Sequence, residues 1–106
     1  MFGLFKSSDI QRIHVNDMDD LIGKAELIDI REPYEYKVGT LRTAKNIPMM
    51  ELLAEPDKYL NKDKTYYLIC QSGARSRQCC KVLSREGFNV VDVTGGYGSY
   101  IGSKRK

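Results

Sequence analysis

Short apolar runs alternate along this chain with segments of helical character. The runs are rich in branched and aromatic side chains, which is typical of buried strands. They lie at 25–31, 44–48, 64–70 and 89–93, the second of them very short. Alternation of this kind predicts βαβ units. We therefore expect an α/β fold with a small parallel β-sheet and helices on both faces.

The segments between these runs carry the start and stop signals of helices. Pro33 suits the first turn of a helix that Gly39 would close. Residues 49–60 have a helical pattern with a break near Pro56. The clearest helix is predicted at 75–88, directly after the strand predicted at 64–70.

A chain of 106 residues without linker or repeat predicts one domain. We expect this domain at 12–101, between an N-terminal tail at 1–11 and a basic, solvated and frayed C-terminal tail at 102–106. Near its start, Asn16 or Asp17 is expected to cap a short helix.

Charge and hydropathy argue against two classes of partner. The net charge of +3 is too weak to indicate nucleic-acid binding. No apolar run approaches the ~20 residues that span a bilayer, and the N-terminus does not resemble a signal peptide. The N-terminal tail is expected to pack on the domain or fray. A weak membrane or partner contact through Phe2, Leu4 and Phe5 is the less favoured alternative.

The chain has three cysteines, and two of them are adjacent. An odd count without a disulfide framework indicates a reducing compartment, so we expect a cytoplasmic protein. The distant His14, interpreted as an ordinary strand residue, gives no metal-ligand spacing, and we expect no metal or cofactor. Cys79 and Cys80 fall in the apolar stripe of the predicted helix, where we interpret them as core residues too distant for an easy disulfide with Cys70.

Cys70 ends the best predicted strand, and the sequence QSGARS follows it. In parallel sheets, functional sites lie beyond the carboxyl ends of strands. A short loop with Gly73 that leads into a helix can turn several N–H groups inward as an anion-binding nest. Arg75 adds a positive charge. These features favour a thiolate, so Cys70 is the candidate nucleophile.

On these residues, the chain resembles single-domain rhodaneses, a family of sulfurtransferases. Four segments match the family pattern in order, namely LIDIREPYEYKVGTL (27–41), NIP (46–48), CQSGARS (70–76) and GFNVVDVTGGYGSY (87–100). Each match is weak by itself, but the ordered set covers the chain from about residue 12 to about residue 100.

The resemblance implies that Cys70 takes a sulfane sulfur from a donor, becomes a persulfide and passes the sulfur to a nucleophilic acceptor. It implies substrate-binding residues in the loop, namely Gln71, Ser72, Gly73, Ala74, Arg75 and Ser76. Ser76 is also expected to cap the following helix. Asp29 and Arg31 match the family too, and we interpret them as a structural hydrogen-bonded pair near the site rather than as catalytic residues.

Thiosulfate, a low-molecular-weight persulfide and a persulfidated partner protein all fit the donor role. A thiol or a cyanide-like nucleophile fits the acceptor role. Because Arg75 is the main cation of the loop, we favour persulfide donors slightly over thiosulfate.

The chain departs from the family at several positions. Thr40 replaces a common histidine, and Arg42 and Thr43 replace a Pro-Gly turn. Tyr100 stands where tryptophan is usual. Gly98 and Gly102 predict that the last helix is short or absent, with loose packing.

Two other functions compete. A phosphatase or an arsenate reductase also surrounds an anion with a cysteine loop, but those enzymes resemble C-x5-R, whereas Cys70 and Arg75 give C-x4-R. A catalytically silent interaction module on the same fold is the second alternative. Such a module is expected to lack the cysteine or the loop glycine, and this chain has both.

Overall fold

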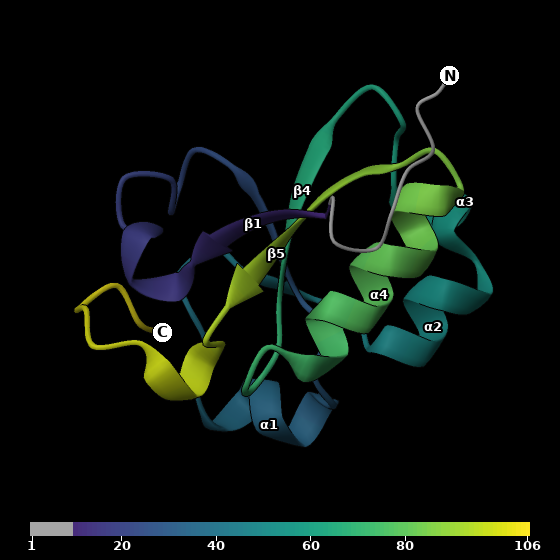
Figure 1. Ribbon diagram of the computed structural model, residues 1–106. Helices are drawn as coiled ribbons and strands as arrows, with labels where there is room; N and C mark the ends of the chain where they lie inside the picture. The colour runs from purple at the N-terminus through teal and green to yellow at the C-terminus, as the bar shows by residue number, and fades with distance from the viewer. Residues whose placement is uncertain (1–9) are drawn as a thin grey trace.

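A single parallel β-sheet organises the protein. The computed structural model describes residues 10–106. Across the sheet, the strands are β1 (Gln11–His14), β5 (Asn89–Thr94), β4 (Thr65–Ile69), β2 (Glu26–Asp29) and β3 (Lys45–Asn46). All neighbouring strands pair in parallel (Figure 1). The carboxyl ends of the strands therefore share one edge of the sheet, which confirms the predicted α/β fold.

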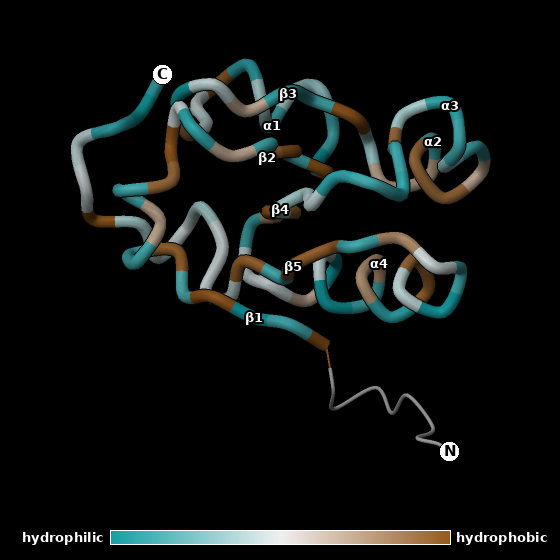
Figure 2. The backbone as a smooth tube through the Cα atoms, turned by 90° about the horizontal axis from the view of Figure 1, so that it is seen from above, coloured by the Kyte–Doolittle hydropathy of each residue, from teal (hydrophilic) through white to brown (hydrophobic). Residues whose placement is uncertain are grey.

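The two faces of the sheet are covered differently (Figure 2). The helices are α1 (Pro33–Val38), α2 (Met49–Ala54), α3 (Pro56–Tyr59) and α4 (Ala74–Arg85), and the 3-10 turns are η2 (Val15–Asp17) and η3 (Tyr97–Ser99). Helices α2 to α4 pack on one face, where Leu52, Leu60 and Leu83 join the core. The other core lies against turns and η2, with Tyr36 of α1 packed on it. No helix of the described part of the chain is long and apolar enough to cross a membrane.

The helix expected after β1 does not form. His14 ends the edge strand, and its Nδ1 accepts the Asn16 N–H at 3.1 Å. Instead of capping a helix, the Asn16 side chain binds the C-terminal part of the chain. Its amide donates to the Ser99 carbonyl oxygen at 3.0 Å, and its carbonyl accepts the Ile101 N–H at 2.9 Å. A long-range contact therefore overrides the local helix signal.

Both chain ends differ from the expected tails. Ile10 is buried in the core, and β1 begins at the next residue. The rest of the expected N-terminal tail, with Phe2, Leu4 and Phe5, lies outside the described residues. The expectation of a frayed C-terminus is wrong, because residues 104–106 pair with residues 40–42 through three backbone hydrogen bonds of 2.9 to 3.3 Å.

The departures from the family pattern have local structural consequences. Thr43 takes the positive φ of 68° at the turn where the family has glycine. The last helix is replaced by the short turn η3, as the glycines predicted. Packing there is nevertheless tight, because Tyr100 is buried and its hydroxyl bonds to Asp19 at 2.7 Å.

Candidate active site

Cys70 lies at the carboxyl edge of the sheet, between the ends of β2 and β5. It follows β4 directly, and α4 begins at Ala74 after a loop of three residues. Figure 1 shows this loop above α1 and beside η3, at the lower edge of the sheet. Cys70 itself is fully buried beneath the exposed residues Gln71 and Ser72.

Two backbone N–H groups, one from the loop and one from the first turn of α4, donate to the Cys70 sulfur. The Gly73 nitrogen lies 3.1 Å from Sγ and the Ser76 nitrogen 3.3 Å from it. Gly73 makes this turn possible with a φ of 101°, and a Cβ at this position would lie 3.3 Å from the backbone nitrogen of Gly95. Inward N–H groups favour negative charge on the sulfur, as the loop sequence led us to expect.

Ser76 has a different place from the one expected. Gly73 precedes α4 as its N-cap and Ser76 lies inside the helix, so the prediction that Ser76 caps it is wrong. The buried Ser76 Oγ lies 3.5 Å from Cys70 Sγ and 2.5 Å from Asp92 Oδ1. Sequence reasoning missed Asp92. The signal that could have found it is a carboxylate inside the apolar run that forms β5.

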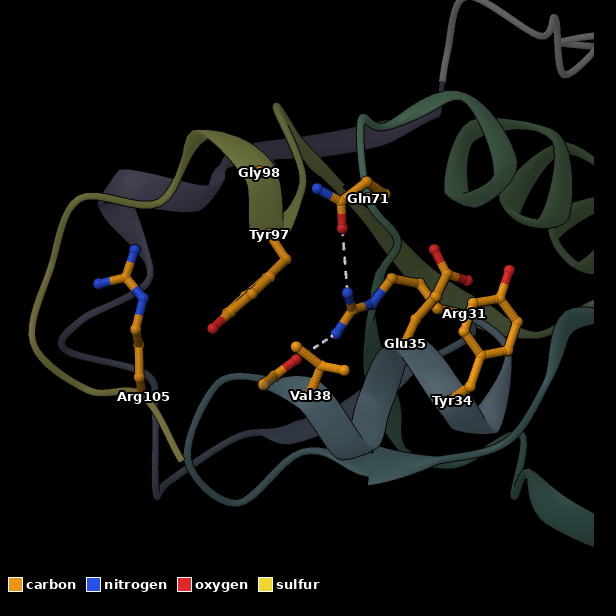
Figure 3. Close-up of a pocket in the computed structure, with 9 residues that line it drawn as sticks. Arg31, Tyr34, Glu35, Val38, Gln71, Tyr97, Gly98 and Arg105 are labelled. Carbon is orange, nitrogen blue, oxygen red and sulfur yellow. Dashed lines mark hydrogen bonds between the residues drawn. The ribbon is translucent and has the colours of Figure 1, made fainter.

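Asp29 and Arg31 form the expected buried pair at the end of β2. The guanidinium donates to both carboxylate oxygens at 2.8 to 3.1 Å. Thr40, which replaces the family histidine, donates its hydroxyl to Asp29 at 2.7 Å. The remaining guanidinium nitrogen, Nη1, donates to Gln71 Oε1 at 3.0 Å, so the pair also holds the first loop residue (Figure 3).

Arg75 is turned towards α1 rather than left free at the loop. Its guanidinium binds both oxygens of Glu35 at 2.9 and 3.1 Å. This pairing lowers the pKa of the Glu35 carboxyl and raises the pKa of Arg75. Glu35 therefore balances the positive charge that Arg75 was expected to add at the loop.

The segment after β5 is fastened to the loop. The N–H groups of Tyr97 and Gly98 donate to the carbonyls of Cys70 and Gln71 at 2.8 and 2.9 Å. At Gly96, a Cβ would lie 2.4 Å from the Gln71 carbonyl oxygen, so the two backbones approach too closely for a side chain.

Two hollows flank the loop. One, of about 450 Å³, lies between α1 and η3 and is lined by Arg31, Tyr34, Glu35, Val38, Gly39, Gln71, Tyr97, Gly98 and Arg105. Figure 3 shows the Tyr97 ring on one side of Arg31, and Tyr34 and Glu35 on the other. The second, of about 280 Å³, is more polar and is lined by Arg12, Ser72, Gly73, Ala74, Arg77, Asp92, Thr94 and Gly95. Of the predicted loop residues, Gln71 thus lines the first hollow and Ser72, Gly73 and Ala74 line the second.

The other two cysteines belong to the core, as predicted. Cys79 and Cys80 are fully buried in α4, and all three thiols are free. Burial raises the pKa of Cys79 to about 12 and raises that of Cys80 as well. Among residues 10–106, no group of three or more His, Cys, Asp or Glu side chains could hold a metal ion.

Comparison with known proteins agrees with this geometry. The sequence is 40% identical over 79 residues to YtwF of Bacillus subtilis (strain 168), covering 74% of this chain and 76% of YtwF. It is 35% identical over 81 residues to a sulfurtransferase of Allochromatium vinosum, covering 76% of this chain and 71% of the relative. The crystal structure of a rhodanese-related protein from Thermoplasma volcanium matches with a TM-score of 0.76 and 39% identity, over 85% of this chain and 89% of the other.

Some relatives are larger proteins with another activity. The tRNA uridine(34) hydroxylase of Pelagibacter ubique is 34% identical over 96 residues, which are 87% of this chain but 30% of the hydroxylase. The model of the Rhodanese-like domain family matches residues 14–103, nearly the whole chain. The protein therefore belongs to the rhodanese-like domain family.

Proposed function

We propose that the protein is a sulfurtransferase that carries a sulfane sulfur on Cys70. The observation that supports this most directly is the pair of N–H groups, from Gly73 and Ser76, that donate to the cysteine sulfur. Hydrogen bonds from these N–H groups stabilise the Cys70 thiolate, which is the form that attacks the sulfur-donating substrate. They also suit the negative charge of the persulfide that forms.

The proposed reaction has two half-reactions. In the first, the Cys70 thiolate attacks the outer sulfur of the donor, a new S–S bond forms, and the rest of the donor leaves with the electron pair of its broken S–S bond. In the second, a thiolate or a cyanide-like acceptor attacks the outer sulfur of the Cys70 persulfide and regenerates the Cys70 thiolate. Each half-reaction conserves charge and needs no oxidant, so ping-pong kinetics are expected.

The first test is the intact mass of the protein after brief exposure to a sulfur donor and again after cyanide. We expect the wild type to gain the mass of one sulfur atom and to lose it as thiocyanate. The matched variant Cys70→Ser should do neither, although it keeps the buried Cys79 and Cys80. If no donor loads the folded wild type, the proposal is wrong and the interaction module is the better reading.

We further propose that an organic persulfide is a better donor than thiosulfate. The hollow between α1 and η3 is lined by Gln71, the residue after Cys70, and by the side chains of Tyr34, Val38 and Tyr97. Apolar walls can bury the organic part of a persulfide, whereas thiosulfate has no such part. The ratio of kcat/KM for glutathione persulfide and for thiosulfate tests this, and a large preference for thiosulfate would overturn it.

A phosphatase is less well supported. Arg75, the cation that would hold a phosphate, is engaged by Glu35 at 2.9 Å. Ready hydrolysis of an aryl phosphate without sulfur transfer would reverse this judgement.

Three free thiols, together with the proposed chemistry, fit a reducing compartment, and we propose that the protein acts in the cytoplasm. A sulfur-relay protein is a further candidate partner.

A further inference from the structure

A buried carboxyl group lies one hydroxyl group away from the proposed nucleophile. Asp92 is in β5, beside Leu68 of β4, and its residue is only 1% exposed. Its Oδ1 lies 2.5 Å from Ser76 Oγ, and the same Oγ lies 3.5 Å from Cys70 Sγ. The three side chains form a continuous row from the sulfur to the carboxyl group, and the transfer steps described above do not use Asp92.

The single hydroxyl hydrogen of Ser76 can be used in two ways within this row. When Asp92 is ionised, Ser76 donates to it, and the Ser76 oxygen accepts the S–H of a Cys70 thiol. When Asp92 is protonated, it donates to the Ser76 oxygen, and Ser76 donates to a Cys70 thiolate. The thiolate then has three donors, because the hydroxyl joins the N–H groups of Gly73 and Ser76. The Gly73 carbonyl, at 3.2 Å, is a longer alternative acceptor for the hydroxyl.

The surroundings of Asp92 act on its carboxyl group in opposite directions. Burial raises the pKa of the Asp92 carboxyl, while the Ser76 hydrogen bond and the cations Arg12 of β1 and Arg77 of α4 oppose this shift. Cys80, whose thiol also interacts with Asp92, has a raised pKa and stays neutral at physiological pH. Asp92 also lines the polar hollow of about 280 Å³.

We infer that Asp92 and Cys70 share one proton through the hydroxyl group of Ser76. When Cys70 ionises, its S–H bond breaks, Ser76 takes that proton and gives its own to Asp92, and a new O–H bond forms on the carboxyl group. The net charge of the row does not change. Asp92 is a positioning residue in this scheme, since it acts on the sulfur only through Ser76. The inference rests on the proposed function, which requires a nucleophilic Cys70, but it can be measured without a sulfur donor.

The test is a pH titration of the thiolate by its ultraviolet absorbance, with the Cys70→Ser signal subtracted. Cys79, with a pKa of about 12, and Cys80 do not ionise in the relevant range. In the wild type, a shared proton spreads thiolate formation over two steps. In Asp92→Asn, whose amide can donate to Ser76 as the protonated acid does, we expect a single step, with the midpoint lowered by about 1 pH unit relative to the main wild-type step.

Ser76→Ala provides the matched control, because it interrupts the row and leaves both end groups in place. In that background, Asp92→Asn should have a clearly smaller effect on the titration, because only the through-space effect of its charge remains. If Asp92→Asn shifted the thiolate titration equally in the wild-type and Ser76→Ala backgrounds, the charge of Asp92 would act on Cys70 directly through space. If it caused no shift in either background, Asp92 would have a structural role only. Either result overturns the inference.

A second readout covers the case in which Asp92→Asn does not fold. The infrared C=O band of the protonated Asp92 carboxyl can be titrated in the wild type and in Cys70→Ala. In Cys70→Ala, the Asp92 band should titrate in a single step. Identical titration curves for the wild type and Cys70→Ala would overturn the inference. Failure of sulfur loading with a coupled titration intact would remove the proposed function alone.

Discussion

Among single residues, the three cysteines differ most in what surrounds their sulfur atoms. Cys70 receives two N–H groups and is covered by an exposed loop, whereas Cys79 and Cys80 lie between α4 and the sheet. Gln71 and Ser72, the two residues after Cys70, are exposed, whereas Cys70 itself is buried. Burial keeps the two core thiols protonated at neutral pH.

We therefore expect iodoacetamide to modify Cys70 of the native protein at neutral pH and to spare Cys79 and Cys80. Because burial raises the pKa of Cys79 to about 12, its thiolate is absent until the protein unfolds. Peptide mass spectrometry across a pH series measures the three sites separately, and full labelling in denaturant is the control. Three cysteines that react together in the native protein would contradict the proposed role of Cys70.

Thr43 stores backbone strain that a single substitution can relieve. It is an exposed, β-branched residue with a φ of 68°, in the region that favours glycine. We expect Thr43→Gly to raise the free energy of unfolding by about 1 kcal/mol. Urea denaturation measures this. Thr65→Gly, at an exposed strand position, is the matched control and should lower the free energy of unfolding. If Thr43→Gly also lowered it, Thr43 would not be strained.

At the scale of elements, sequence periodicity predicted what local interactions determine. The strand before Cys70, helix α4 and strand β5 carry their own patterns, and the predicted ranges agree with the observed bounds to within a few residues. The loop around Cys70 could be predicted for the same reason, since its position depends only on the strand before it and the helix after it.

Contacts between distant residues could not be predicted. Asn16 has the sequence context of a helix cap, yet its side-chain oxygen accepts the N–H of Ile101, 85 residues further along the chain. Glu35 is separated from its partner Arg75 by 40 residues of sequence. Asp92 is separated from its partner Ser76 by 16 residues. Local periodicity contains no information on such pairs, because the fold alone brings them together. The position of the loop around Cys70 was thus predicted, whereas the pairing of Glu35 with Arg75 and of Asp92 with Ser76 was missed.

The link between α1 and α4 leads to a prediction about charge at the site. Glu35 neutralises Arg75, so Glu35→Gln should leave the guanidinium positive and unbalanced beside the loop. We expect the KM for thiosulfate, a dianion, to fall by roughly threefold, and less so at high salt. Steady-state kinetics at two ionic strengths measure this. Glu32→Gln, at the exposed start of α1, is the control, and an unchanged KM in Glu35→Gln would show that Arg75 does not act on the donor.

At the scale of the whole molecule, three distant segments build the larger hollow. Helix α1 supplies Tyr34 and Val38, the segment after β5 supplies Tyr97, and the C-terminal segment supplies Arg105. The Arg105 guanidinium stacks on the Tyr97 ring, 5.7 Å from its centroid, and donates to the carbonyl of Tyr100. The pairing of residues 104–106 with residues 40–42 keeps this wall in place. The C-terminal segment is therefore part of the wall of this hollow rather than a solvated end.

If this hollow holds the organic part of a persulfide, its apolar rim should set donor preference. Tyr34 and Val38 are 72% and 90% exposed, so truncating them leaves the core intact. We expect Tyr34→Ala and Val38→Ser each to lower kcat/KM for glutathione persulfide by roughly fivefold, the loss of about 1 kcal/mol of apolar contact. The rate with thiosulfate should stay the same. Ile101→Ser, at a side chain that is 85% exposed and outside the hollow, is the matched control and should change neither rate. Equal losses with both donors would mean that the rim shapes the loop instead of binding the donor, because thiosulfate has no organic part to lose contact with.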